Sequence, residues 1–362
     1  MNPRKINFNP GPGALPLSVL EKARDQLVSY HNTGMSILEM SHRSKEFEEI
    51  LDGAKRRLRS LLKISEQYDI LFLQGGATHQ FVMIPLNFAS TDRPGAYIIT
   101  GAWAKKAYKE AKILSRGVVA ASTESEKFVR IPKEEEIRVP PNAAYLHITS
   151  NNTIFGTQYE SFPQTSSVPL IADMSSDIMS REIDVNRFGL IYAGAQKNLG
   201  PAGVTVVIVR KDLIQRIDET ISTPLRYQTH AAENSLYNTP PTFSIYMVDL
   251  YLEWLESYGG VSAMEHTNNN KAQIIYALLD RFPEFYRGTV DEDHRSRMNI
   301  TFRLPSEELE ALFLAESKKS GFVGLKGHRS VGGIRVSLYN AITRNETTKL
   351  AEFMKVFCEQ HG

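Results

Sequence analysis

Short apolar runs recur through residues 68–210, and their spacing constrains the fold of this chain more than any other feature. Apolar residues at helical spacing precede these runs in 17–30 and 44–62, and helical or loop segments separate many of the runs. The strand-like runs are YDILFLQ (68–74), GAYIIT (95–100), AAYLHIT (143–149), VPLIAD (168–173), FGLIYAG (188–194) and GVTVVIVR (203–210). Such alternation predicts an α/β domain built around a mainly parallel sheet.

A long helical pattern over residues 242–259 leads into a different C-terminal part. Two further strand-like runs lie there, RMNITFRL (297–304) and GGIRVSLYNAI (332–342). We therefore expect a large domain over residues 16–259. A smaller α/β domain is expected over residues 260–362, joined by the N-terminal segment 1–15.

The charge balance excludes several classes of partner. Lys plus Arg (42) nearly equals Asp plus Glu (41), so the net charge of +1 predicts neither a nucleic-acid nor a membrane partner. No apolar run approaches the ~20 residues of a membrane span. The N-terminus lacks the apolar core of a signal peptide, and the single cysteine, Cys358, fits a reducing compartment, so we expect a cytoplasmic protein. The histidines His31, His79 and His147 lack metal-ligand spacing, and no metal site is expected.

One lysine stands at the junction of two apolar segments. Lys197 lies between GLIYAGAQ and the glycine-rich turn that precedes GVTVVIVR, and Asp173 ends a strand-like run 24 positions earlier (197 − 173). Ligands of α/β sheets bind at the carboxyl ends of strands, so both side chains are expected to face one cleft. The pair suits pyridoxal phosphate, because a lysine forms its Schiff base and a carboxylate keeps its pyridine nitrogen protonated. A purely structural buried ion pair is the alternative.

A glycine turn offers a place for the phosphate of such a cofactor. In LQGGATHQF (73–81) a strand ends, Gly75 and Gly76 permit a tight turn, and Ala77-Thr78 open a helix whose N-terminus favours an anion. The alternative is a plain connection, since neither common phosphate-loop fingerprint is present. Asn238-Thr239-Pro240-Pro241 is a second candidate, in which Thr239 is expected to cap the next helix and Pro240 to occupy its first turn.

The segment ADMSSDIMSREIDV…FGLIYAGAQKNLGPAGVTVVIVR resembles the central region of the phosphoserine aminotransferases, a group of fold-type-I, class V pyridoxal-phosphate enzymes. Further segments match in the same order: FNPGPGALP, MSHRSKEFEEI (40–50), the glycine turn, NTPPTFSIY (238–246), RSRMNITF (295–302) and LKGHRSVGGIRVSLYNA (325–341). The resemblance covers almost the whole chain. It implies a large domain with a seven-stranded type of sheet flanked by helices, and a smaller C-terminal domain.

The resemblance also implies roles for individual residues. Lys197 would form the Schiff base, Asp173 would hold the pyridine nitrogen, Trp103 would stack on the cofactor and Thr153 would donate near its phenolic oxygen. The phosphate would be bound by Gly76, Ala77, Thr78 and Gln196 of one subunit and by Asn238 and Thr239 of the neighbouring subunit of a homodimer. Some relatives carry arginine in place of Thr78, so one phosphate contact is expected to be weaker here.

The substrate residues are arginines and histidines at the ends of elements. Arg335 shares a strand face with Ser337 and Tyr339 and, by the resemblance, would hold the substrate α-carboxylate, while His42, Arg43, His328 and Arg329 would bind the distal anion. The implied reaction is reversible transfer of the amino group of L-glutamate to 3-phosphohydroxypyruvate, giving O-phospho-L-serine and 2-oxoglutarate. The phosphorylated hydroxythreonine pair of vitamin B6 synthesis is a possible second substrate.

Two other classes of protein share part of this pattern. Another class V enzyme, such as an alanine–glyoxylate aminotransferase or a cysteine desulfurase, would also have Lys197 and Asp173. A desulfurase needs a reactive cysteine in a mobile loop, whereas Cys358 lies four residues from the end of the sequence. A non-catalytic protein that binds phosphate ligands would need the clefts but not the lysine.

Overall fold

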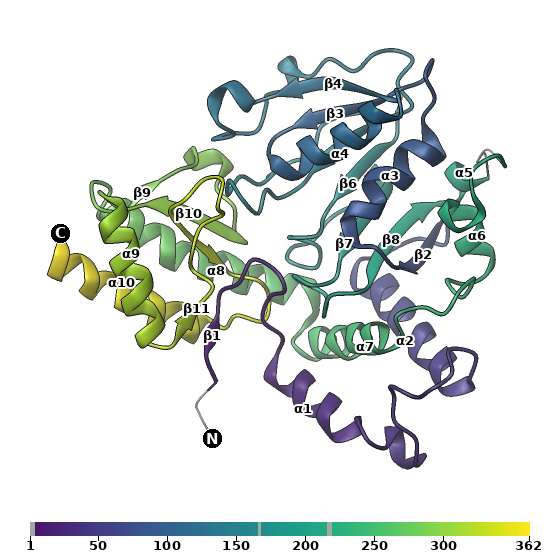
Figure 1. Ribbon diagram of the computed structural model, residues 1–362, viewed down its shortest axis with the longest axis horizontal. Coiled ribbons are helices and arrows are strands. Elements are labelled where there is room, and N and C mark those ends of the chain that lie inside the picture. The colour runs from purple at the N-terminus through teal and green to yellow at the C-terminus, as the bar shows by residue number, and fades with distance from the viewer. Residues whose placement is uncertain (1–3, 166–167, 216–218) are drawn as a thin grey trace.

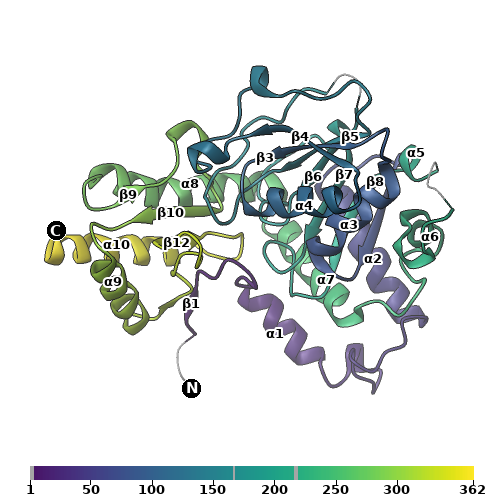
Figure 2. The ribbon, with the colours of Figure 1, turned by 45° about the horizontal axis from the view of Figure 1, so that its top comes forward.

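The computed structural model describes residues 4–165, 168–215 and 219–362 (Figure 1, Figure 2). Its strands are β1 (Ile6–Asn7), β2 (Tyr68–Leu73), β3 (Gly95–Ile99), β4 (Gly117–Ser122), β5 (Tyr145–Thr149), β6 (Leu170–Asp173), β7 (Phe188–Gly194), β8 (Thr205–Arg210), β9 (Arg287–Gly288), β10 (Asn299–Arg303), β11 (Phe322–Val323) and β12 (Ile334–Ser337). Its α-helices are α1 (Leu17–Gln26), α2 (Lys45–Leu61), α3 (Gly76–Phe88), α4 (Ala102–Ile113), α5 (Lys211–Ile214), α6 (Tyr227–Ala232), α7 (Thr242–Ser257), α8 (Gly260–Arg281), α9 (Glu307–Lys319) and α10 (Arg344–His361). None of the helices within these ranges combines the length and the apolar character that a bilayer span requires.

The large sheet has seven strands in the order β2-β8-β7-β6-β5-β3-β4. Strand β8 runs antiparallel to both of its neighbours, and the other pairs are parallel, so the predicted mainly parallel α/β sheet is confirmed. The sequence patterns missed β4 (GVVAAS), an edge strand. Its apolar run has only four residues, and two of them are alanines, which are depleted in strands.

Alternate residues of each strand pack against helices on opposite faces of this sheet. In β7, Ile191 and Ala193 belong to the apolar core shared with α2 and α7, whereas Leu190 and Tyr192 belong to the core shared with α3. Helices α3 and α4 therefore cover one face while α2 and α7 cover the other (Figure 2). Because both faces are covered, the strands read as nearly continuous apolar runs.

The C-terminal part forms its own smaller sheet, in the order β12-β10-β9, next to α8, α9 and α10 (Figure 1). Strand β1 pairs in parallel with β11, and Phe8 is buried in the same apolar core as Ile275 and Phe313. The predicted smaller C-terminal α/β part is confirmed. The division at residue 260 stays a prediction, since α8 contributes Met264 to the core of the large sheet and Ile275 to the C-terminal core.

The start of α7 differs from the sequence prediction. The helix begins at Thr242 with Pro241 at its N-cap position, so the expected cap by Thr239 and the expected place of Pro240 in the first turn are wrong. The physical reason is the Pro-Pro pair, since a proline restricts the residue before it to extended backbone and so delays the helix past Pro240.

Candidate active site

The carboxyl ends of three neighbouring strands bring the expected cofactor residues together. Asp173 is the last residue of β6, Thr153 follows β5, and Lys197 follows β7. Strands β5, β6 and β7 are adjacent in the sheet, and Lys197 Nζ donates a hydrogen bond to Thr153 Oγ1 at 2.8 Å. A cavity of about 120 Å³ at this edge is lined by Gly76, Ala77, Thr78, Trp103, Thr149, Asn151, Thr153, Asp173, Ser175, Ser176, Gln196 and Lys197.

Lys197 lies in a turn whose two ends are tied to each other. Gly194 pairs with Thr205, and the backbone N–H of Ala195 donates to the carbonyl of Val204 at 3.0 Å. Burial lowers the pKa of Lys197 to about 8, against the opposing charge of Asp173. An ordinary lysine titrates near 10.4, so this amine is neutral far more often near pH 7. The neutral amine is the form that attacks an aldehyde.

Asp173 is only 5% exposed, and Ser175 N donates to its Oδ1 at 2.9 Å. Burial raises the pKa of Asp173, whereas the hydrogen bond from Ser175 and the charge of Lys197 lower it. A buried carboxylate is stabilised by a cationic partner, and a protonated pyridine nitrogen would be one. Ser175 was missed by the sequence analysis, although a serine two residues after an aspartate is a common turn signal.

The glycine turn before α3 has the geometry of an anion cradle. Gly75 and Gly76 have φ of +87° and +63°, and α3 begins at Gly76. A Cβ on Gly75 would lie 1.9 Å from His79 Nδ1, so only glycine fits beneath that ring. The first N–H groups of a helix have no acceptor within the helix, and here they line the cavity at Gly76, Ala77 and Thr78. The site thus fits the phosphate of the expected cofactor.

Trp103 lies in the first turn of α4 and lines the same cavity. Lys197 Nζ is 5.7 Å from the centroid of its ring, and Lys106 Nζ is 4.3 Å from it. The indole Nε1 is buried, with no hydrogen-bond partner among the described residues. Lys106 is a second residue that the sequence analysis missed, and its position three residues after Trp103 on a helix was the available signal.

Arg335 enters the site from β12 of the C-terminal sheet. Arg335 is 5% exposed, and its Nη1 donates to the carbonyl oxygen of Thr153 at 3.1 Å. Burial lowers the pKa of Arg335, and its Nε finds no hydrogen-bond partner in the part of the chain that the structure describes. A buried cation with a free donor suits a carboxylate ligand. The expected alternation of β12 is confirmed, since Ile334 and Val336 face the C-terminal core.

His328 and Arg329 lie in the turn between Lys326 and Ile334, which form an isolated antiparallel bridge. Ser330 N donates to His328 Nδ1 at 3.3 Å, so the neutral ring carries its proton on Nε2. Burial lowers the pKa of His328, and the charges of Arg335, Arg329 and Lys106 lower it further. These cations therefore share one region, and an anion bound among them would favour the protonated form of His328.

The N-terminal segment covers the turn that carries Lys197. Gly13 N donates to the carbonyl oxygen of Gln196 at 2.7 Å. A Cβ on Gly13 would lie 2.8 Å from the ring of Tyr339, so the close approach requires glycine. This contact gives FNPGPGALP a structural role at the site that the sequence analysis did not assign.

Two pairs of expected site residues lie elsewhere within the single chain. Arg43 Nε donates to His42 Nε2 at 3.3 Å, in the segment between α1 and α2. Asn238 Nδ2 donates to Gln74 Oε1 at 3.0 Å, and Gln74 Nε2 donates to the carbonyl oxygen of Thr239 at 2.8 Å. The two pairs do not line the cavity beside Lys197.

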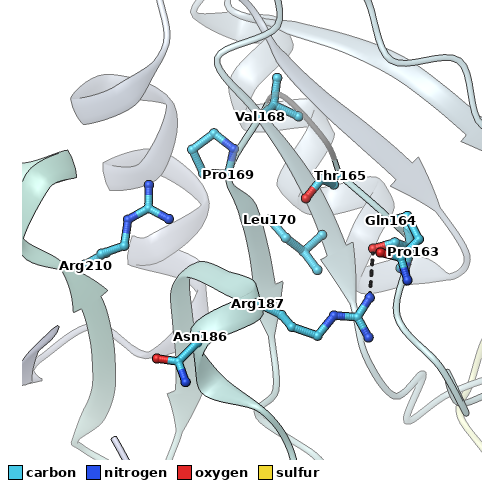
Figure 3. A pocket seen from close by; sticks show the side chains of 9 residues that line it. All are labelled: Pro163, Gln164, Thr165, Val168, Pro169, Leu170, Asn186, Arg187 and Arg210. Atoms are coloured by element: carbon cyan, nitrogen blue, oxygen red, sulfur yellow. Dashed lines mark hydrogen bonds between the residues drawn. The ribbon is translucent and has the colours of Figure 1, made fainter. Parts of the chain in front are cut away.

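A cavity of about 400 Å³ lies at the opposite edge of the sheet, where β6 and β7 begin (Figure 3). Its arginines already have partners. Arg187 Nη2 donates to the carbonyl oxygens of Phe162 at 2.9 Å and Pro163 at 3.3 Å, and Arg210 forms an ion pair with Asp212 at 2.5 Å. This cavity contains none of the expected site residues.

Comparison with known proteins gives consistent similarities. Residues 6–350 match the family model Aminotransferase class-V. A phosphoserine aminotransferase of Lysinibacillus sphaericus is 55% identical over 361 residues, which cover 100% of both chains.

Solved structures are similar over the same length. The phosphoserine aminotransferase of Bacillus circulans subsp. alkalophilus has a TM-score of 0.97 and 54% identity, covering 99% of both chains. A phosphoserine aminotransferase of Trichomonas vaginalis, described as PLP bound, has a TM-score of 0.92 and 37% identity, covering 97% of this chain and 100% of that one.

Proposed function

Because the chain belongs to the phosphoserine aminotransferases of the aminotransferase class-V family, we propose that it transfers the amino group of L-glutamate to 3-phosphohydroxypyruvate. The products are O-phospho-L-serine and 2-oxoglutarate, and the reaction belongs to L-serine biosynthesis. The protein is a pyridoxal-phosphate-dependent aminotransferase. The observation that carries the proposal is that Lys197 and Asp173 line one cavity while Arg335 binds Thr153 at the edge of that cavity.

Lys197 and Asp173 are the proposed catalytic pair. When bound, pyridoxal phosphate supplies an electron sink for the negative charge that develops at the substrate Cα. Asp173 would hold a proton on the pyridine nitrogen as long as it stays a carboxylate, the form that its hydrogen bond from Ser175 favours. Lys197 would anchor the cofactor, and its amine, once free, would carry a proton between the substrate Cα and C4′ of the cofactor. Its lowered pKa suits both directions of that transfer.

The phosphate site is proposed to combine two chains. Gly76, Ala77, Thr78 and Gln196 line the cavity, and Trp103 offers its ring to the cofactor face. Asn238 and Thr239 lie outside the cavity of their own chain, exposed beside Gln74, where a second copy can receive them. We therefore infer a homodimer in which these two residues complete the neighbouring site. Thr78, a short neutral side chain, gives a weaker phosphate contact than an arginine would.

The substrate site is proposed to bind the two anionic groups at opposite ends of the substrate. Arg335 binds the α-carboxylate, and His328 and Arg329 bind the distal anion. His42 and Arg43 do not line the cavity of their own chain, so we assign them to the distal-anion site of the neighbouring subunit. Four donors of this kind exceed the needs of a carboxylate and match a phosphate, which has three acceptor oxygens.

Two further assignments accompany this function. We propose that residues 16–259 form the large domain, and that residues 260–362 with 1–15 form the small one. The near balance of charges and the absence of a spanning helix in the described ranges support an enzyme whose partners are small molecules, and we place it in the cytoplasm.

A screen of amino acceptors tests the function. The enzyme loaded with pyridoxal phosphate is first converted by L-glutamate, and the product is then mixed with single keto acids while the cofactor absorbance is followed. We expect 3-phosphohydroxypyruvate to restore the starting spectrum fastest. Glyoxylate and the phosphorylated keto acid of vitamin B6 synthesis form the other arms. A faster reaction with glyoxylate would refute the proposed substrate.

A further inference from the structure

The turn that carries His328 and Arg329 is held on one side by its own backbone. Gly327 N donates to the carbonyl of Gly333 at 2.8 Å, and Gly332 N donates to the carbonyl of His328 at 2.8 Å. Glycine is needed at its end, because Gly332 and Gly333 have φ of +76° and +71°. A turn rich in glycine has many accessible backbone conformations when unfolded, so two backbone hydrogen bonds alone stabilise this conformation only weakly.

Two charged side chains outside the turn bind its C-terminal limb. Glu310, on α9, accepts a hydrogen bond from Gly333 N through Oε2 at 3.2 Å and one from Arg303 Nε through Oε1 at 2.5 Å. Arg303, the last residue of β10, also donates from Nη1 to the carbonyl of Val331 at 3.1 Å. We call Arg303 and Glu310 the turn clamp.

The turn clamp is buried at Glu310, whereas the side chain of Arg303 is 37% exposed. Glu310 is 7% exposed, and its Oε1 also accepts from Leu304 N at 3.4 Å. A Cβ on Gly333 would lie 2.7 Å from Arg303 Cδ, so the arginine stem packs directly on the turn. Both carboxylate oxygens of Glu310 are thus used, one for the arginine and one for the turn. A buried carboxylate with this set of donors is costly to replace.

We propose that Glu310 and Arg303 are positioning residues for the distal-anion site of the substrate. They touch neither the cofactor cavity nor the reacting atoms. They fix the limb that leads from His328 and Arg329 into Arg335, and so they set the place of the donors that distinguish a phosphate from a carboxylate. This inference rests on the proposed function, since it assumes that a phosphate binds at His328 and Arg329.

The test compares Glu310→Gln with Glu307→Gln, a control on the exposed first turn of the same helix. Glutamine keeps one acceptor but presents an NH₂ group to a donor, so one of the two bonds at Glu310 is lost. We expect the KM for O-phospho-L-serine to rise about tenfold, as for one lost charged hydrogen bond, with kcat within about twofold. The KM for L-glutamate should rise less, because its carboxylate needs fewer donors. Glu307→Gln should leave all three constants unchanged.

Hydrogen exchange gives a readout that needs no substrate. In the holoenzyme, the amides of residues 327–333 should exchange faster in Glu310→Gln than in the parent or in Glu307→Gln. If Glu310→Gln does not fold, Arg303→Lys supplies the same test, because lysine keeps the charge but cannot bind Glu310 and Val331 together.

Three outcomes would overturn the proposal: unchanged exchange, an unchanged KM for O-phospho-L-serine, or an equal loss for both amino acids. Failure of the proposed function is seen separately, because the parent enzyme would then not react with O-phospho-L-serine, whatever the exchange rates of the variants.

Discussion

Lys197 Nζ and Arg335 Nη1 both donate to Thr153, the lysine to Oγ1 at 2.8 Å and the arginine to the carbonyl oxygen at 3.1 Å. The lysine comes from the turn after β7, and the arginine comes from β12 of the other sheet. One residue therefore sets the separation between the amine that we propose acts at Cα and the cation that we propose holds the α-carboxylate. Fixed separations of this kind lower the entropy cost of reaching the transition state.

Replacing Lys197 tests its assignment. Lys197→Ala should reduce turnover by several orders of magnitude, because it removes both the anchoring amine and the proton carrier. The variant should still bind pyridoxal phosphate without a covalent bond, since the other cavity residues are intact. Absorbance spectroscopy and equilibrium dialysis would follow the cofactor, and a coupled assay would follow activity. Near-normal turnover by the purified variant would remove the assignment.

Replacing Asp173 separates charge from position. Asp173→Asn keeps the shape but cannot hold a proton on the pyridine nitrogen, and we expect a loss of about 2–4 kcal/mol in transition-state stabilisation, typical of a lost electrostatic contact. Asp173→Glu should also be impaired, because the longer side chain moves the carboxylate from its place beside Ser175. Single-turnover rates with L-glutamate provide the measurement. If Asp173→Asn reacts at the parent rate, the carboxylate has a structural role only.

The two arginines of the substrate site should differ in their effects. Arg329→Leu should lower kcat/KM for 3-phosphohydroxypyruvate more than for L-glutamate, by about 1–3 kcal/mol for a lost charged hydrogen bond. Arg335→Leu should damage both substrates, since both carry an α-carboxylate. Steady-state kinetics with each substrate varied in turn would decide. Equal losses from Arg329→Leu would mean that the phosphate is read elsewhere.

Mixed dimers test whether the site is shared between chains. One chain carries Lys197→Ala, and the other carries Asn238→Ala with Thr239→Ala. Each homodimer should be nearly inactive, whereas the mixed dimer should regain part of the activity because one of its two sites has all intact groups. Two affinity tags would isolate the mixed dimer for assay. If the verified mixed dimer stays inactive, Asn238 and Thr239 act within their own chain.

The sequence predicted those features whose cause is local. The strand runs of the large sheet are visible because both faces are buried, and Asp173 and Lys197 were identifiable because strand ends gather at one edge. The edge strand β4 was missed because its apolar run is short and half of it is alanine, which is depleted in strands. The start of α7 was predicted wrongly because a proline is favoured in the first turn of a helix, whereas Pro241 restricts the residue before it, Pro240, to extended backbone.

Contacts between distant segments could not be predicted from the sequence. The contact of Gly13 with Gln196 joins positions far apart in the chain, and Thr153 binds Arg335 from the other sheet. Such pairs leave no periodic signal, because the contacts depend on how the two sheets pack against each other. Glu310 likewise reads as one more acidic residue of an exposed helix until the turn packs against it.

The buried histidine of β5 predicts a pH dependence of stability. His147 is 1% exposed, its Nε2 lies 2.9 Å from the hydroxyl of Tyr192, and burial lowers the pKa of His147 to about 3. Between that value and its unfolded pKa of about 6.5, the unfolded state binds the extra proton. The free energy of unfolding should therefore fall by up to about 1.4 kcal/mol for each pH unit below 6.5 from this group alone.

Urea unfolding of the cofactor-free protein at several pH values and one protein concentration would measure this slope. His147→Gln should show a shallower fall in the free energy of unfolding between pH 6.5 and pH 4. His266→Gln, at an exposed position of α8, is the matched control and should keep the parent slope. Parallel slopes for the parent and His147→Gln would contradict the prediction.

The reversed direction of β8 has a consequence for how the enzyme can move. If β8 were parallel to β7, the chain after Lys197 would have to cross back to the amino ends of the strands before β8 began. Because β8 is antiparallel, the segment with Lys197 starts and finishes at the carboxyl end of β7. Both ends of the turn that carries the amine are therefore anchored to the large sheet, and Asp173 lies on the neighbouring strand of the same sheet. Arg335 and His328 depend on the C-terminal part. A swing of that part toward or away from the sheet would tighten or release the substrate while the lysine and the aspartate keep their mutual alignment.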